Sequence, residues 1–214
     1  MTTHLPSSRT LLSSLFSQLP AYLGDHSEAN TSFNVLKDAS PAIKQLFLTL
    51  HCLFPNEFLP ALDLLDRQLV TRVTIRTSNE DDNVADTRAK VYYVRSSQPT
   101  RTSRYQGTAA LGATSYEVRL EAWNCSCPAF TFSAFSHMTM DRGSIDYMEE
   151  SIGQDNQGQQ WRFGGLMVGN GAMPVCKHLL ACVLVEKCGL LSGFVQQKVV
   201  GRQEAAGLGA GWGG

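Results

Sequence analysis

The chain has 214 residues, 43% of them apolar, which is enough for one domain with a substantial hydrophobic core. It carries 18 basic and 19 acidic residues, and this balance argues against tight nucleic-acid binding by bulk electrostatics alone. No apolar run approaches the roughly 18 residues of a membrane helix, so we expect no membrane span. Six cysteines without a clear signal peptide indicate reduced thiols inside the cell rather than a secreted disulfide framework.

Residues 1–68 are predicted to form an N-terminal helical region. Apolar side chains between Leu11 and Leu19 recur at helical spacing and predict the first helix. This end is also rich in serine, carries Arg9 and has no acidic residue before Asp25, which is a composition typical of transit peptides. We favour a docked amphipathic helix over a transit peptide.

Two further helices and a hairpin follow. Ser40 is an N-cap residue followed by proline, a pair typical of a helix start, and a shorter helix is predicted over 56–67. The period then changes, and residues 70–75 and 90–95 have the β-branched and aromatic composition of strands. We therefore predict a β-hairpin and a basic loop within 69–114.

The segment 115–192 is predicted to hold the most informative structure. Residues 116–122 alternate between apolar and polar side chains, as a half-buried strand does. The stretch 133–160 is polar and acidic and reads as an insertion, after which 161–168 could return as a strand. A helix with apolar leucines and valines begins next to Cys176.

The C-terminal end is predicted from its glycines. Gly189 is placed to cap the preceding helix, and the segment 193–214 is rich in glycine, so we expect a mobile tail there. The whole pattern predicts an α+β fold with N-terminal helices, antiparallel β-hairpins and a final helix.

Two short cysteine pairs lie at switches between predicted elements. Cys125 and Cys127 follow a strand, and Cys176 and His178 begin a helix. Thiolate and imidazole suit Zn²⁺, which takes four ligands in a tetrahedron. Four protein ligands leave no open position for water, so such a site would be structural and would clamp a ββα-like unit. The alternative is that these residues are buried free thiols and a surface histidine.

The remaining cysteines have simpler explanations. Cys182 lies one helical turn after His178 and is a rival ligand, but its apolar neighbours favour a place in the core. Cys188 is expected to be structural as well. The pair His51 and Cys52 sits on an apolar helix and is expected to pack rather than to bind.

The stretches WNCSCPAF and VCKHLLA together resemble the SWIM zinc finger, whose pattern is Cys-x-Cys followed by Cys-x-His. The extension to Ala181 gives Cys-x-His-x-x-Ala and is similar to the Sws-type proteins, the SWIM subunits of the Shu complex. The resemblance implies that Cys125, Cys127, Cys176 and His178 bind one structural zinc ion. A small side chain at Ala181 would let the helix pack close to the metal.

The resemblance also implies a function. Proteins of this type are non-enzymatic nuclear adaptors that bind RecA-like recombinase paralogues. They help to assemble the recombinase filament in homologous recombination and error-free tolerance of replication damage, and DNA would be contacted through these partners. The exposed apolar residues of the N-terminal helices, together with Phe130, Phe132 and Phe135, are candidates for the partner surface, and the three phenylalanines could equally fill the core.

One other function is open to test, and a further one is excluded by the sequence. Direct binding of single-stranded nucleic acid is indicated by basic residues that alternate with aromatic ones. This stretch contains Arg88, Lys90, Tyr92, Tyr93, Arg95, Arg101, Arg104 and Tyr105. A zinc deaminase is rejected, because His26 and Glu28 match only half of the signature and the required Pro-Cys-x-x-Cys half is absent.

Overall fold

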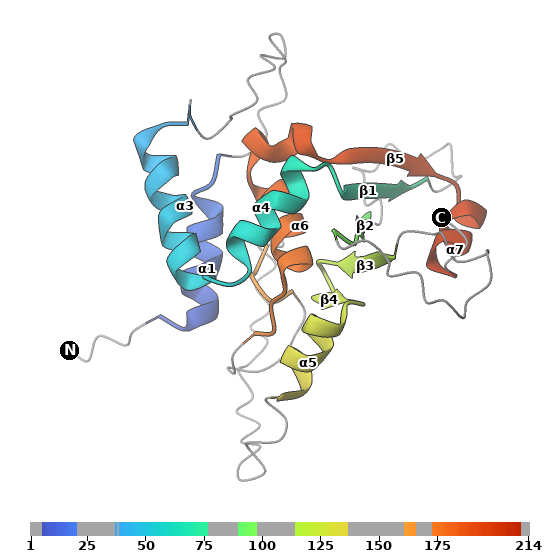
Figure 1. The fold of residues 1–214 in the computed structure, drawn as a ribbon, viewed down its shortest axis with the longest axis horizontal. Helices are drawn as coiled ribbons and strands as arrows, with labels where there is room; N and C mark the ends of the chain where they lie inside the picture. The colour runs from blue at the N-terminus through green and yellow to red at the C-terminus, as the bar shows by residue number, and fades with distance from the viewer. Residues whose placement is uncertain are drawn as a thin grey trace, which may run out of the picture.

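The structure is a computed structural model of the 214-residue chain. It describes residues 6–20, 37, 39–76, 90–97, 114–136, 161–165 and 173–210. The structural statements below concern these residues. The architecture is α+β, as predicted, with helices at the N-terminal end and a mixed sheet (Figure 1).

Within the described residues, three helices precede the sheet, and all three were predicted. They are α1 (Ser8–Ser17), α3 (Pro41–Leu53) and α4 (Phe58–Asp66). The side chain of Ser7 accepts a hydrogen bond from the backbone N–H of the first turn of α1, and Ser40 does the same for α3. Each serine therefore satisfies a backbone donor that the helix itself leaves unpaired.

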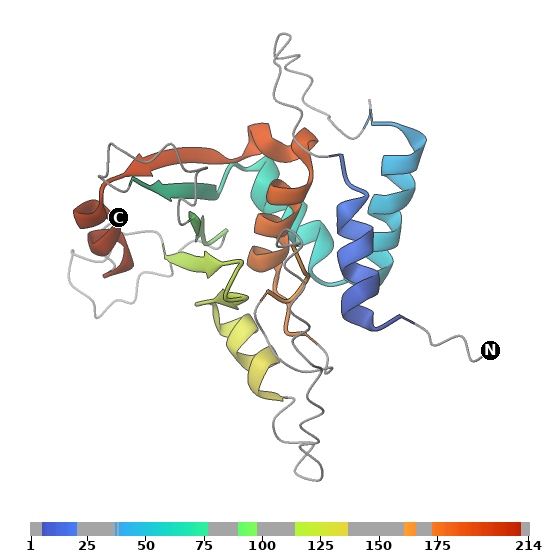
Figure 2. The same ribbon diagram turned by 180° about the vertical axis from the view of Figure 1, so that it is seen from behind.

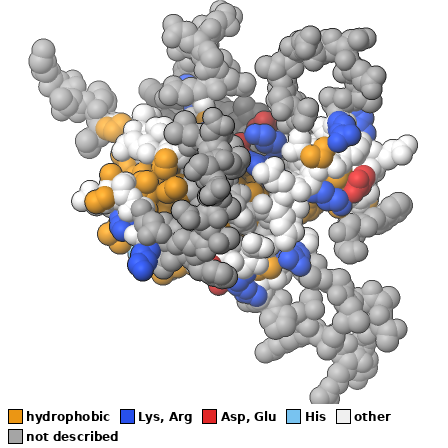
Figure 3. All heavy atoms as spheres, turned by 90° about the horizontal axis from the view of Figure 1, so that it is seen from above, with side chains coloured by type: hydrophobic (Ala, Val, Ile, Leu, Met, Phe, Trp, Pro, Cys, Tyr) orange, Lys and Arg blue, Asp and Glu red, His pale blue; other side chains and the backbone are white. Residues whose placement is uncertain are grey.

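α1 and α3 occupy the end of the molecule away from α7 (Arg202–Gly209), as both ribbon views show (Figures 1 and 2). Phe16 of α1 is fully buried, which confirms the prediction of a docked amphipathic helix. Hydrophobic side chains also gather on the outer surface at this end (Figure 3). The exposed ones on α1, α3 and α4 include Leu11, Leu48, Leu53 and Leu59.

The sheet has five strands in the order β4-β3-β2-β1-β5. Their bounds are β1 Val70–Ile75, β2 Lys90–Arg95, β3 Ser115–Arg119, β4 Asn124–Cys125 and β5 Gln196–Val200. β1 and β2 are antiparallel, which confirms the predicted hairpin, and β3 and β4 continue that pattern. β5 pairs with β1 in parallel, so the sheet is mixed rather than purely antiparallel.

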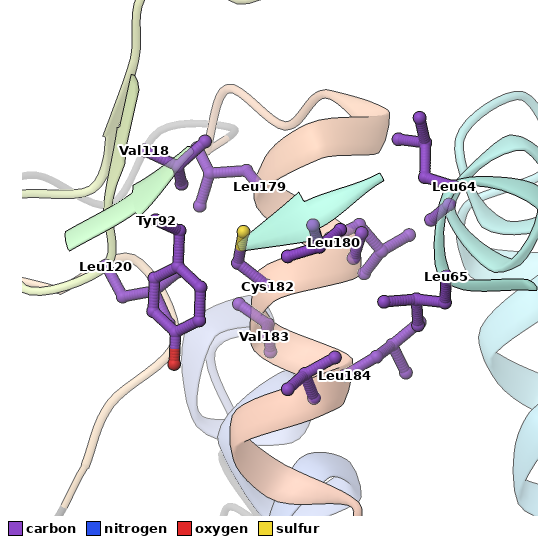
Figure 4. Close-up of a cluster of buried hydrophobic side chains, with 14 of the residues drawn as sticks. Leu64, Leu65, Tyr92, Val118, Leu120, Leu179, Leu180, Cys182, Val183 and Leu184 are labelled. Atoms are coloured by element: carbon purple, nitrogen blue, oxygen red, sulfur yellow. The ribbon is translucent and has the colours of Figure 1, made fainter. Parts of the chain in front are cut away.

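α6 (Lys177–Lys187) is the central element of the core. Every residue from His178 to Val185 is buried. Figure 4 shows why: Val118, Leu120 and Tyr92 lie on one side of α6, and Leu64 and Leu65 of α4 lie on the other. A helix that is covered on opposite sides has no polar face within that stretch, and the sequence accordingly reads LLACVLV.

An ionic cluster ties the end of α6 to the sheet. The carboxylate of Glu186 accepts hydrogen bonds from the Tyr92 hydroxyl at 2.5 Å and from Lys90 Nζ at 2.9 Å. Arg72 Nη1 lies 3.3 Å from the same carboxylate. Burial alone would raise the pKa of Glu186, but the hydrogen bonds from Tyr92 and Lys90 outweigh it and lower the pKa below its ordinary value. Burial, together with the charge and the hydrogen bond of Glu186, raises the pKa of Tyr92.

Two predictions in the middle of the chain are corrected. Residues 133–136 belong to helix α5 (Pro128–Ser136), so the polar insertion does not begin at 133, and 137–160 lie outside the described residues. Residues 161–165 form a turn instead of the expected strand, and 166–168 are not described. Gly164 and Gly165 have φ values of 91° and 54°, which extended strands do not adopt.

The C-terminal predictions are also corrected. Gly189 does not cap α6, because Cys188 takes that position and Gly189 begins the 3₁₀ helix η1 (Gly189–Phe194). The segment expected to be a mobile tail contains β5 and α7. The high glycine content of this segment was therefore a poor guide to its order. β5 is hydrogen-bonded to β1, and an ion pair of 2.8 Å joins Lys198 of β5 to Glu204 of α7.

Candidate metal centre

The structure brings the four predicted ligands together. The three sulfurs of Cys125, Cys127 and Cys176 and one ring nitrogen of His178 all lie within 4.8 Å of one another, and all four residues are buried. Two thiolates bound to one tetrahedral zinc ion lie about 3.8 Å apart, since each Zn–S bond is about 2.3 Å. The group is therefore compact enough to hold one metal ion.

Cys125 is placed by the sheet and by the turn before it. It ends β4 and pairs with Val118 of β3, whose side chain lies beside α6 (Figure 4). Trp123 has a φ of 48°, and this left-handed residue lets the chain reverse between β3 and β4. Its indole Nε1–H donates to the carbonyl of Pro174 at 2.9 Å. This bond joins the segment before Cys125 to the segment before Cys176.

Ser126, between the first two cysteines, fixes the backbone to β3. Its N–H donates to the carbonyl of Glu117 at 3.0 Å, and its hydroxyl accepts from the Glu117 N–H at 2.9 Å. These two bonds continue the ladder by one residue beyond β4. With Ser126 held at the sheet, Cys125 and Cys127 both turn inward to the same cluster.

Two of the cysteines lie at helix starts. Cys176 is the N-cap of α6, and its sulfur accepts from Leu179 N–H at 3.4 Å. Cys127 has the same relation to α5, because its sulfur accepts from Phe130 N–H at 3.3 Å. Backbone N–H groups and the positive end of a helix dipole both favour a thiolate. These backbone contacts would stabilise the thiolate form of both sulfurs if a metal ion were bound.

His178 presents Nδ1 to the cluster, at 4.0 Å from the sulfur of Cys125. The ring of Tyr116 lies against the imidazole, with 4.7 Å between ring centroids. The other nitrogen, Nε2, is buried without a hydrogen-bond partner in the described part of the chain. The ring is therefore oriented by Tyr116 and by the position of His178 in the first turn of α6.

The three thiols strongly affect one another. Hydrogen bonds with Cys125 and Cys176 lower the pKa of Cys127 well below its ordinary value. Hydrogen bonds with Cys127 and Cys176, together with burial, raise the pKa of Cys125. For Cys176 the bond with Cys125 lowers the pKa, but the bond with Cys127 and burial raise it to about 12. A divalent cation bound by these sulfurs would favour the ionised form of all three thiols.

The sequence analysis did not identify the segment 161–165 as a support of the site. Phe163 is buried and its ring packs against Trp123, with 4.5 Å between ring centroids. Gly165 comes so close to the turn after β3 that a Cβ atom would lie 2.3 Å from the carbonyl oxygen of Glu121. Arg9 of α1 donates to the carbonyl of Gly165. The one available signal was Trp123, which interrupts the alternation of the strand.

Cys182 and Cys188 are placed as predicted, and Cys52, which was expected to pack, is not. Cys182 and Cys188 are buried in the core and lie outside the four-residue group. Cys52 is exposed, and His51 packs against Phe58 with 6.0 Å between ring centroids. Ala181 is fully buried one turn after His178, where a larger side chain would not fit without rearrangement.

The three candidate phenylalanines divide between two environments. Phe130 is buried and belongs to the core. Phe132 and Phe135 are 76% and 60% exposed, respectively. The first therefore holds α5 against the domain, and the other two remain available to contact another molecule.

The described part of the predicted basic stretch does not form an open basic surface. Lys90 and Arg95 are exposed, but Lys90 is paired with Glu186. Tyr92 is buried, and the Tyr93 hydroxyl donates to Glu117. The other members of the stretch, Arg88, Arg101, Arg104 and Tyr105, lie outside the described residues.

No family model and no curated protein sequence gives a significant match to this chain. Within the described residues, no helix is long and apolar enough to cross a membrane. The fold and the site define an α+β protein with a buried cluster of three cysteines and one histidine that could hold a metal ion.

Proposed function

We propose that this chain is a zinc-binding adaptor protein without catalytic activity. The observation that carries the proposal is the buried group of Cys125, Cys127, Cys176 and His178. Three thiolates and one imidazole suit Zn²⁺ and fill its tetrahedral shell. A filled shell leaves no position for a reacting water, so the ion would stabilise structure rather than activate a substrate.

The zinc ion would connect elements that are distant in the sequence. It would hold the end of β4 and the start of α5 against the start of α6. Structural zinc sites contribute about 10–16 kcal/mol of apparent binding free energy, against a usual net domain stability of about 5–15 kcal/mol. The local structure around the site should therefore depend on the metal.

Exposed apolar side chains support the adaptor role. Leu48 of α3 and Leu59 of α4 are 64% and 56% exposed, and Phe132 and Phe135 of α5 are exposed as well. Contiguous exposed apolar patches commonly mark protein-binding surfaces, so the leucines of α3 and α4 and the phenylalanines of α5 are two candidate surfaces. From the resemblance to Sws-type SWIM proteins, the proposed partner is a RecA-like recombinase paralogue in the nucleus. The complex would promote recombinase filament assembly in homologous recombination.

Metal analysis of the purified full chain tests the site directly. We expect about one zinc ion per chain in the wild type, and Cys176→Ser should lose most of it, because a hydroxyl is a poor replacement for a thiolate ligand. Cys52→Ser is the matched control, since Cys52 is exposed and outside the group. A zinc content near zero in the wild type would refute the proposal.

Affinity purification with mass spectrometry tests the partner. The wild type and Cys52→Ser should recover a RecA-like paralogue, and Cys176→Ser should not. A second variant, Leu48→Asp, places a charge on an exposed position of α3, far from the metal ligands in the sequence. It tests whether the exposed apolar surface of the N-terminal helices binds the partner. Recovery of the same proteins by wild type and Cys176→Ser would separate the partner from the metal site and contradict the adaptor mechanism.

A further inference from the structure

Helix α5 is attached to the domain much more weakly than α6. It has nine residues, no acidic side chain in its first turn, and Phe130 as the single buried side chain among its described residues. α6 is buried from His178 to Val185 between the sheet and α4. A helix shorter than about 12 residues is marginal in water unless other contacts hold it. The order of α5 therefore depends on what holds its N-terminus.

The four ligands differ in how the rest of the protein holds them. Cys176 and His178 begin the buried helix α6. Cys125 lies in the sheet, between Trp123 and Ser126, which are both hydrogen-bonded to other segments. Cys127 is the last ligand before α5, one residue beyond the last ladder bond. Cys127 contributes to α5 through its sulfur, which accepts from Phe130 N–H, and through its carbonyl, which accepts from Thr131 N–H at 3.2 Å.

We propose that metal occupancy controls whether α5 is ordered, so that the metal site acts as a switch for this one helix. The inference rests on the proposed metal site. A bound ion would tie the sulfur of Cys127 to three ligands that other contacts already hold in place. Without the ion, Phe130 and the thiol contacts of Cys127 remain, while the sheet, α4 and α6 keep the rest of the core.

The switch has a consequence at the surface. Phe132 and Phe135 follow Phe130 on the same short helix, and both are largely exposed. The metal would fix the direction in which these two rings point. Loss of the metal would release the rings together with α5 and leave the exposed leucines of α3 and α4 unchanged.

Hydrogen exchange of the full chain, with zinc bound and after chelation, tests the proposal. On chelation we expect the amides of α5 to exchange at least about tenfold faster, because local opening becomes the favoured state of this helix. The amides of α6, β1 and β2 should stay well protected and change much less than those of α5, since most of their burial does not involve the ion. The rise should reverse when zinc is added back.

Serine variants of two ligands separate metal loss from loss of the helix cap. Serine is itself a good N-cap residue, so Cys127→Ser and Cys176→Ser both keep an acceptor at the start of their helix. Both should release α5 and leave α6 protected, because each removes the metal. Phe132→Ala is the control, since its side chain is exposed, and the zinc-bound variant should keep α5 protected.

The outcomes separate the switch from the metal site itself. If the chain binds zinc and chelation leaves α5 protected, the helix does not depend on the metal and the switch is refuted. If chelation releases α6 and β1 together with α5, the ion holds the whole domain and the switch is also refuted. If the pure chain binds no zinc when the metal is supplied, both this inference and the proposed function are overturned.

Discussion

The indole of Trp123 links the two halves of the metal site through a hydrogen bond that does not involve the four candidate ligands. Its Nε1–H donates to the carbonyl of Pro174, two residues before Cys176, and Trp123 itself lies two residues before Cys125. Trp123→Phe removes the donor and keeps an aromatic ring for the contact with Phe163. The buried Pro174 carbonyl then loses its partner, which costs about 1–3 kcal/mol.

This cost should appear in metal binding as well as in stability. If all of it falls on the zinc-bound state, an affinity loss of about 5- to 150-fold follows from about 1.4 kcal/mol per tenfold. Competition with a chromophoric chelator measures the affinity, and urea denaturation measures the free energy of unfolding. Trp161→Phe is the matched control, because Trp161 is half-buried and lies outside the two ligand segments. Wild-type zinc affinity and stability in Trp123→Phe would show that the indole bond does not position the ligands.

Two further substitutions test the supports of the site. Gly165→Ala should destabilise the chain by about 1–3 kcal/mol, because φ is positive at this position and the new Cβ would overlap the Glu121 carbonyl. Thermal unfolding measures this loss, and an unchanged melting temperature would contradict it. Glu186→Gln should cost about 1.5–3 kcal/mol at neutral pH, because charged hydrogen bonds from Tyr92 and Lys90 are lost. The folded-state pKa of Glu186 is lowered, so its contribution is present above the ordinary value of 4.5 and is lost as the pH falls through the folded pKa. Stability measured against pH should therefore fall less steeply in acid for the variant than for the wild type.

Local patterns predicted most of the fold because they act over a few residues. Ser40 with its following proline marked a helix start, and the apolar run after Cys176 marked α6. Glycine content was a poor guide at the C-terminus, since β5 is stabilised by pairing with β1, more than a hundred residues earlier. No local pattern reveals such a partner, and this is why the parallel edge of the sheet was missed.

The ligands were predictable and their supports were not. Cysteine and histidine at short spacing have few other uses, so Cys125 and His178 stood out without any knowledge of the fold. Ser126 and Gly165 act through backbone bonds and close approach, and such roles are specific to the tertiary structure. Trp123 was predictable only in part. The sequence showed that it interrupts the alternation of the strand, but not that its indole binds the Pro174 carbonyl.

The register of the sheet is itself part of the metal site. Tyr92, Val118 and Cys125 are paired across β2, β3 and β4, so their side chains share the face that covers α6. A slip of one residue between β3 and β4 would turn Cys125 to the opposite face, away from His178. β4 has only two residues and cannot by itself specify that register strongly. A metal ion that binds only when Cys125 faces α6 would add to the hydrogen bonds of Trp123 and Ser126 in favouring the observed register over the slipped one.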